Sequence, residues 1–151
     1  MRIALAAGLL TAALVGCGDI GTLQLALDFD PPALEDATRG LRVVIREGPT
    51  DGSTGCDALW GAPPAGLRQT TAVTAYPNQD DVLAAAVSLE YPVLSLFVYA
   101  HSEIDRVASE EPGGEERLEV LGDAFAGGCV DQPIDDASVS TEVPLVLAPA
   151  P

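Results

Sequence analysis

Hydrophobic and polar residues alternate over several short segments of the chain, a pattern typical of half-buried β-strands. In residues 22–29, Leu23, Leu25, Leu27 and Phe29 share one face. Residues 92–101 are instead apolar on both faces, which indicates a central strand covered on both sides. The same criteria predict strands at residues 22–29, 39–47, 67–76, 92–101, 118–125 and 139–147.

Residues 81–90 are ambiguous between helix and strand. The alanines at 84–86 favour a helix, whereas Val82, Val87 and Leu89 allow a strand. We favour a strand, which brings the count to about seven with turn signals between them and no long amphipathic helix. This pattern predicts an all-β fold, an antiparallel two-sheet sandwich.

The segments between the predicted strands are rich in turn-forming residues. Residues 48–66 contain many Gly and Pro, and we expect Trp60, which lies among them, to cover an edge of the core. Residues 103–116 are acidic and predict a solvated loop, and residues 131–136 predict a turn. Pro144 falls inside the last strand and therefore predicts an edge position or a bulge.

Two further details concern single strands. Arg42 and Arg46 alternate with the apolar residues of their strand, so we expect them on its solvent face in weak surface ion pairs. Gly127 and Gly128 precede Cys129 and leave room for a close backbone approach there.

The first seventeen residues have the features of a signal peptide. Arg2 supplies a positive start, an apolar stretch follows, and the sixteen residues before Cys17 are short for a membrane span. The ending Leu14-Val15-Gly16-Cys17 resembles the lipobox of bacterial lipoproteins. An ordinary secretory signal or a transmembrane anchor are the alternatives.

The lipoprotein resemblance implies cleavage before Cys17 and a lipid anchor on its thiol and amino group. Fatty chains of this kind hold a protein on a bilayer through about 0.8 kcal/mol per buried CH2, so the implied partner is the lipid bilayer. Gly18 rather than Asp follows Cys17, which favours the outer membrane of a Gram-negative bacterium. The expected organisation is residues 1–16 signal peptide, 17–21 lipidated tether, 22–147 β-sandwich and 148–151 tail.

The predicted body also resembles the small β-sandwich domains, immunoglobulin-like or transthyretin-like, of lipoproteins from high-GC Gram-negative bacteria. The resemblance rests on the strand at residues 94–100 and on Gly128-Cys129 followed by an alternating strand.

With Cys17 lipidated, Cys56 and Cys129 are the remaining cysteines. Exported chains fold in an oxidising compartment, so this pair predicts a disulfide. Closing so long a loop stabilises the folded state by roughly 4 kcal/mol in the chain-entropy treatment. A metal site is a poor alternative, because there is no C-x-x-C spacing and only one distant histidine.

Charge excludes several function classes. The chain has 7 Lys+Arg against 23 Asp+Glu and a formal net charge of −16. Every positive residue is Arg, which rules out lysine-dependent chemistry, and clustered positive charge for nucleic acid is missing, so we expect no nucleic-acid partner. A hydrophobic fraction of 48% is too high for a disordered chain.

Candidate chemistry is sparse. His101 is the only histidine, and a general base needs a nucleophile and an orienting acid beside it. Residues adjacent to His101 on a strand would point to the opposite face of the sheet and could not act together with it. We therefore expect His101 to be a strand-end or surface residue rather than a catalytic base. Weak calcium binding is an alternative, with Asp131, Asp135 and Asp136 as first candidates.

The sequence therefore predicts a membrane-anchored envelope lipoprotein that serves as a non-enzymatic binding, adaptor or structural module without a cofactor. Its ligand and any protein partner are left open. The alternatives are a calcium- or carbohydrate-binding module and a small envelope hydrolase that uses His101.

Overall fold

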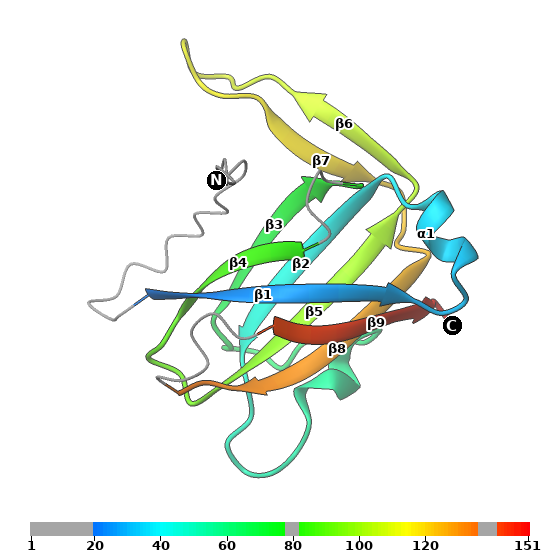
Figure 1. The fold of residues 1–151 in the computed structure, drawn as a ribbon. Helices are drawn as coiled ribbons and strands as arrows, with labels where there is room; N and C mark the ends of the chain where they lie inside the picture. The colour runs from blue at the N-terminus through cyan, green and yellow to red at the C-terminus, as the bar shows by residue number, and fades with distance from the viewer. Residues whose placement is uncertain (1–19, 78–81, 136–141) are drawn as a thin grey trace, which may run out of the picture.

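The structure, a computed structural model, describes residues 20–77, 82–135 and 142–151. Strands dominate it (Figure 1). In chain order the elements are β1 (Ile20–Phe29), α1 (Ala33–Ala37), β2 (Gly40–Glu47), the short 3-10 helix η1 (Gly55–Ala58), β3 (Gln69–Ala75), β4 (Val82–Ser88), β5 (Val93–His101), β6 (Glu103–Val107), β7 (Arg117–Leu121), β8 (Ala126–Pro133) and β9 (Glu142–Pro149).

Seven of the described strands form one curled sheet in the order β3-β2-β5-β8-β9-β1-β4, and β6 pairs only with β7. The prediction of an all-β fold is confirmed. The expectation of antiparallel pairing throughout is wrong at one place, because β1 and β9 run parallel, with Leu25 opposite Val143. β1 and β9 lie far apart in the sequence, so no tight hairpin joins them and a parallel pairing is possible.

The core lies inside the curl. Figure 1 shows β1 and β4 passing in front of β2 and β5, and side chains from both sets bury one another. Each large apolar side chain buried here stabilises the fold by about 1.5–3 kcal/mol. The fully buried members include Leu25 of β1, Leu41 of β2, Leu96 and Val98 of β5, and Leu147 of β9.

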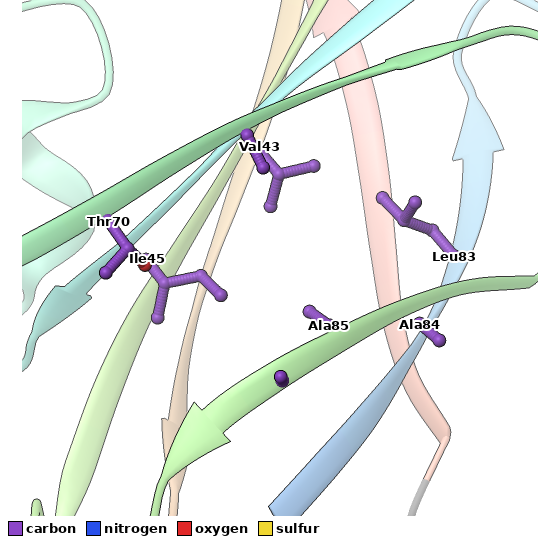
Figure 2. A pocket seen from close by; sticks show the side chains of 8 residues that line it. Val43, Ile45, Thr70, Leu83, Ala84 and Ala85 are labelled. Atoms are coloured by element: carbon purple, nitrogen blue, oxygen red, sulfur yellow. The ribbon is translucent and has the colours of Figure 1, made fainter. Parts of the chain in front are cut away.

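The two edge strands β3 and β4 approach one another where the curl nearly closes. Figure 2 shows Val43, Ile45 and Thr70 on one side of this seam and Leu83, Ala84 and Ala85 on the other. The cavity between them has a volume of about 10 Å³, room for a single water at most. The strand predicted at residues 81–90 is confirmed for Val82–Ser88.

Strand β5 is covered on both faces, as its continuous apolar run predicts. Its second face carries Phe97 and Tyr99, which form a smaller buried cluster with Val44. Residues 48–68, the connection between β2 and β3, lie against this face through Leu59. We call these residues the covering segment.

Two strands form where loops were predicted. Residues 103–107 form β6, which pairs with β7 although both carry charged side chains; Ile104 packs against the backbone at Gly40, where an added Cβ would lie 2.1 Å from its Cγ2. The strand predicted at residues 118–125 ends at Leu121, and residues 126–133 form the unpredicted strand β8 beside β5, which replaces the turn expected from residue 131. The short helix α1 follows Pro31-Pro32 and was not predicted.

The last strand also differs from expectation. Ala148 and Pro149, expected in the tail, pair with Gly127 and Ala126 of β8. Pro144 lies opposite Ala26 of β1, at a position where β9 has no pairing with β8. β9 lies between β8 and β1 in the sheet, so Pro144 is not on an edge strand as expected, but its missing N–H falls where the ladder with β8 has ended.

Candidate ligand-binding pocket

A disulfide fastens the covering segment to the sheet. Cys56, in η1, is bonded to Cys129 of β8, with a Cα–Cα distance of 5.5 Å. The predicted disulfide is confirmed, and it holds a turn-rich segment that has no strand pairing of its own against β8.

A polar cluster makes a second attachment beside the disulfide. The Asp131 carboxylate accepts hydrogen bonds from Thr54 Oγ1 at 2.7 Å, from the Gly55 backbone N–H at 3.0 Å and from Ser95 Oγ at 2.6 Å. A Cβ on Gly55 would lie 2.1 Å from Ser95 Oγ, so only glycine lets the segment come this close. Asp131 thus joins the covering segment to both β5 and β8.

The residues proposed for calcium are not brought together within the described part of the chain. Asp135 is exposed beyond the end of β8, and Asp136 lies outside the described residues. Among described residues, the one group of three potential metal ligands is Cys56, Cys129 and Asp131. Its two sulfur atoms are bonded to each other, which removes the thiolates that a metal would need.

Aromatic packing is a third attachment. The Trp60 ring meets the Tyr99 ring edge-on, with centroids 5.6 Å apart, and lies over Gly127, where a Cβ would be 2.9 Å from the indole. The Tyr99 hydroxyl donates to the Leu59 carbonyl at 2.7 Å. Burial raises the pKa of Tyr99, although Arg46 and Arg42 oppose the shift, so the hydroxyl keeps its proton as this donor. Trp60 remains 41% exposed and covers the outer face of the sheet rather than a core edge.

A pocket of about 390 Å³ lies between the covering segment and the outer face of β2 and β5. Phe97 and Ser95 of β5 and Arg46 of β2 line it on the sheet side. The covering segment contributes mainly apolar groups, among them Pro49, Ala58, Ala62, Pro64 and Leu67. Pockets of this size with apolar walls and a few polar groups are typical of small-molecule sites.

Arg42 and Arg46 do not form the predicted surface ion pairs within the described part of the chain. Arg42 lies over the Tyr99 ring, 4.7 Å from its centroid, and Arg46 lies over Phe97 at 4.4 Å. Because β5 places aromatic side chains on this face beside β2, the guanidinium groups stack on rings instead of reaching into solvent. Arg46 is only 8% exposed, so it is a buried cation in the pocket wall.

His101 lies away from the pocket. It is the last residue of β5, opposite Gly40, and it is 2% exposed. The strand-end prediction is confirmed, but the residue is buried rather than superficial. Burial lowers the pKa of His101 and the nearby charge of Arg42 lowers it further, while the Leu121 and Gly122 backbone and the Asp123 charge act in the opposite direction. The imidazole is therefore neutral at pH 7.

The pocket itself was not predicted from the sequence, although two signals for it were present. Ser95 is a polar residue inside the most apolar strand, and the segment of residues 48–66 carries both a cysteine and the single tryptophan. A polar side chain on a buried strand needs a partner, which here is the Asp131 carboxylate of β8, the same group that holds the covering segment.

Comparisons of the chain with protein-family models, with curated proteins and with solved structures give no match. Cys17 and residues 1–16, for which a signal peptide is predicted, lie outside the described residues. No helix in the described part is long and apolar enough to span a membrane.

Proposed function

We propose that this chain is a lipid-anchored protein of the bacterial cell envelope whose β-body is a non-enzymatic binding module, with its ligand site in the pocket under the covering segment. The binding part of the proposal rests on the pocket, and the lipid-anchor part rests on the lipobox.

Three attachments support a binding role for the pocket. The disulfide, the Asp131 cluster and Trp60 hold the covering segment against β5 and β8, yet the segment stays far enough from β2 to leave about 390 Å³. A fixed wall keeps the site formed before a ligand arrives, which lowers the ordering cost of binding.

The anchor rests on Leu14-Val15-Gly16-Cys17 alone. The first strand begins at Ile20, so a lipid on Cys17 would leave only a short tether between the bilayer and the body. The outer membrane of a Gram-negative bacterium stays the proposed location, because Gly18 rather than Asp follows the cysteine.

A binding role is favoured over a hydrolase that uses His101. The imidazole is buried at the opposite end of the β2–β5 ladder from Arg46 and Ser95. It is not among the residues that line the pocket, whereas a general base must reach its substrate directly or through one water.

We further propose that the curled sheet is a two-layer sandwich, with β3-β2-β5-β8 facing β4-β1-β9. The shared core supports this division, and so does the short junction between β8 and β9, which is two residue pairs long. If β6 and β7 are left out, the remaining seven strands can be counted in chain order, so that β8 is the sixth and β9 the seventh. One layer then holds the second, third, fifth and sixth strands, and the other holds the first, fourth and seventh. Immunoglobulin domains group the first, second, fourth and fifth together, so the order supports the transthyretin-like alternative.

Calorimetric titration with two aromatic probes of the same shape, 2-naphthoate and the neutral 2-naphthamide, tests the pocket. We expect at least one probe to bind and the pocket-filling Ala62→Trp to weaken binding by about tenfold or more. Ala65→Trp is the matched control, since Ala65 is an exposed neighbour that does not line the pocket. No binding of either probe, or equal weakening by both variants, would contradict the proposal.

Metabolic labelling with an alkynyl fatty acid tests the anchor. The wild-type chain should be labelled and recovered with membranes, whereas Cys17→Ser should lose the label. Cys129→Ser serves as a control that removes a disulfide-bonded cysteine of the body and should leave labelling intact. Equal labelling of the wild type and Cys17→Ser would reject the anchor.

A further inference from the structure

Arg46 is an incompletely paired cation in the wall of the pocket. Its Nε donates to Gln69 Oε1 at 2.9 Å, and its guanidinium carbon lies 4.4 Å from the centre of the Phe97 ring. Nη1 is buried without a hydrogen-bond partner, and no described carboxylate lies within ion-pair distance of the side chain. In a chain with a net charge of −16, a buried arginine without an acidic partner among the described residues is unexpected.

The energetics of burial explain why this arrangement points to a ligand. Removing a guanidinium from water is costly unless it is paired and hydrogen-bonded. The Phe97 ring recovers only part of that cost, and Gln69 is uncharged. An anionic group bound in the pocket would supply the missing partner, and arginine presents a planar set of N–H donors that matches a carboxylate.

The rest of the lining narrows the class of anion. The walls are mainly apolar, through Phe97, Leu67 and the two prolines, Pro49 and Pro64. Glu47 and Asp57 are also among the lining residues, and their negative charges make each further negative charge on a ligand less favourable. A molecule with an apolar body and one carboxylate satisfies both conditions, whereas a phosphate ester or other polyanion does not.

We propose that the pocket binds small organic acids with an apolar body and a single carboxylate, and that the carboxylate pairs with Arg46. This inference rests on the proposed binding function and names the ligand class for the same site. The apolar body lies against Leu67 and the prolines of the covering segment, and the ligand carboxylate pairs with the side of the Arg46 guanidinium that lines the pocket.

Arg42 supplies a matched control on the same strand. It stacks on Tyr99 much as Arg46 stacks on Phe97, and its Nε is also buried without a partner. Arg42 does not line the pocket, however. Replacing either arginine by glutamine removes one positive charge from the outer face of β2, but only Arg46→Gln changes the lining of the pocket.

The experiment compares the affinities of 2-naphthoate and 2-naphthamide for the full chain in detergent. We expect the wild type to bind the carboxylate at least about tenfold more tightly than the amide. Arg46→Gln should abolish this preference while keeping amide binding, and Arg42→Gln should keep the preference. Arg46→Lys, which retains the charge without the planar donors, should show a smaller preference than the wild type.

Each other outcome overturns a stated part of the proposal. Equal affinity of the wild type for both probes contradicts a role for the carboxylate, and this comparison needs no variant to fold. A preference that persists in Arg46→Gln, or that Arg42→Gln loses equally, contradicts the assignment to Arg46. Tighter binding of 2-naphthyl phosphate than of 2-naphthoate contradicts the single-charge class. If neither the carboxylate nor the amide binds, the proposed binding function itself fails.

Discussion

The covering segment and the β6–β7 hairpin extend from opposite ends of the same sheet (Figure 1), but they are stabilised in different ways. The covering segment has no strand pairing and depends on the disulfide, Asp131 and Trp60. The hairpin has its own ladder of hydrogen bonds and meets the sheet where β7 lies beside β2 and β3 and where Ile104 packs against Gly40.

The difference explains why only one of the two encloses a pocket. A hairpin pairs many of its backbone groups within its own ladder, so it needs fewer attachments to the sheet than an irregular segment does. An irregular segment must satisfy its polar groups elsewhere, and three separate attachments let it span the sheet without collapsing onto it. The comparison predicts that substitutions at the attachments are costly and that substitutions in the hairpin are not.

The largest expected effect is the loss of the disulfide. Replacing Cys56 and Cys129 together by serine should lower the free energy of unfolding by about 4 kcal/mol, because the cross-link closes a long loop in the unfolded chain. Urea denaturation measures the change, and limited proteolysis should show cleavage within residues 48–68 before cleavage in the hairpin. Equal stability of the wild type with and without reductant would contradict this prediction.

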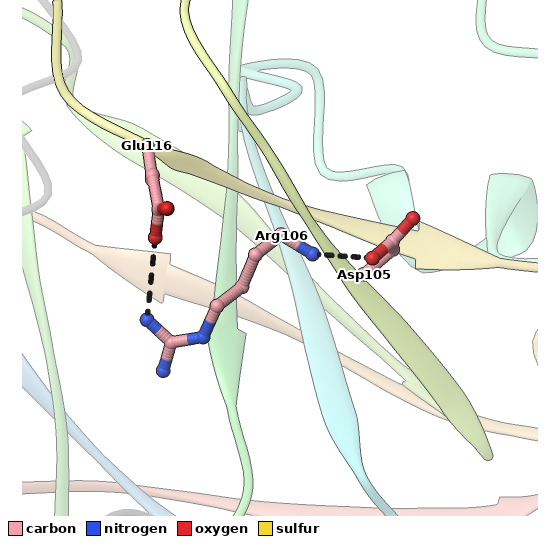
Figure 3. Close-up of polar contacts among 3 residues, drawn as sticks. All are labelled: Asp105, Arg106 and Glu116. Carbon is pink, nitrogen blue, oxygen red and sulfur yellow. Dashed lines mark hydrogen bonds and ion pairs between the residues drawn. The ribbon is translucent and has the colours of Figure 1, made fainter.

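The next effect is at Asp131. Asp131→Ala removes the acceptor for Thr54, Gly55 and Ser95 and should cost roughly 1–3 kcal/mol, since the donors are left without their partner. Asp105→Ala is the matched change in the hairpin, where the carboxylate accepts only from the exposed backbone N–H of Arg106 (Figure 3). We expect Asp105→Ala to lower the free energy of unfolding by less than about 0.5 kcal/mol. A cost for Asp105→Ala as large as for Asp131→Ala would remove the distinction between the two regions.

The same comparison shows what the sequence could predict. The alternation in residues 22–29 and the double-sided apolar run in residues 92–101 report burial directly, so β1 and β5 were predicted correctly. The disulfide followed from the cysteine count. Strand β8 was missed, because Gly127 and Gly128 are poor strand formers and Asp131 and Gln132 resemble turn residues. Asp131 nevertheless has its hydrogen-bond partners at residues 54 and 55, far away in the sequence.

The prediction of surface ion pairs for Arg42 and Arg46 failed for a related reason. Alternation correctly put them on the outer face of β2, but that face is covered by a segment whose position depends on a long-range disulfide. Their stacking on Tyr99 and Phe97 depends on which residues of β5 lie beside β2, and this register is set by tertiary packing rather than by either strand alone.

Acidification should weaken the fold through His101, where the hairpin end of β5 is buried. Burial lowers the pKa of His101 below its ordinary value of 6.5, so the unfolded chain takes up a proton at a higher pH than the folded chain does. Stability is therefore fully present above the unfolded pKa and is lost as the pH falls toward the lowered folded pKa. His101→Leu should remove this part of the decline.

The measurement is urea denaturation of wild type and His101→Leu at about pH 7.5 and about pH 5.5, a window that spans the unfolded pKa. For each protein, the free energy of unfolding at one pH is subtracted from that at the other, and only this change is compared. Any pH-independent cost of the substitution therefore cancels. Parallel declines in both proteins would show that the histidine does not titrate differently on folding.

The smallest effect belongs to the ion pair of the hairpin. Arg106 Nη1 and Glu116 Oε2 are 3.8 Å apart, and their side chains are 73% and 65% exposed. Figure 3 shows the contact between β6 and the start of β7. A double-mutant cycle with alanine at both positions should give a coupling below about 0.5 kcal/mol, and added salt should weaken it further, because exposed pairs are well solvated and screened. A coupling above about 1 kcal/mol would mean that the hairpin, like the covering segment, depends on specific side-chain attachments. The contrast between a hydrogen-bonded hairpin and a segment held by side chains would then no longer explain where the pocket forms.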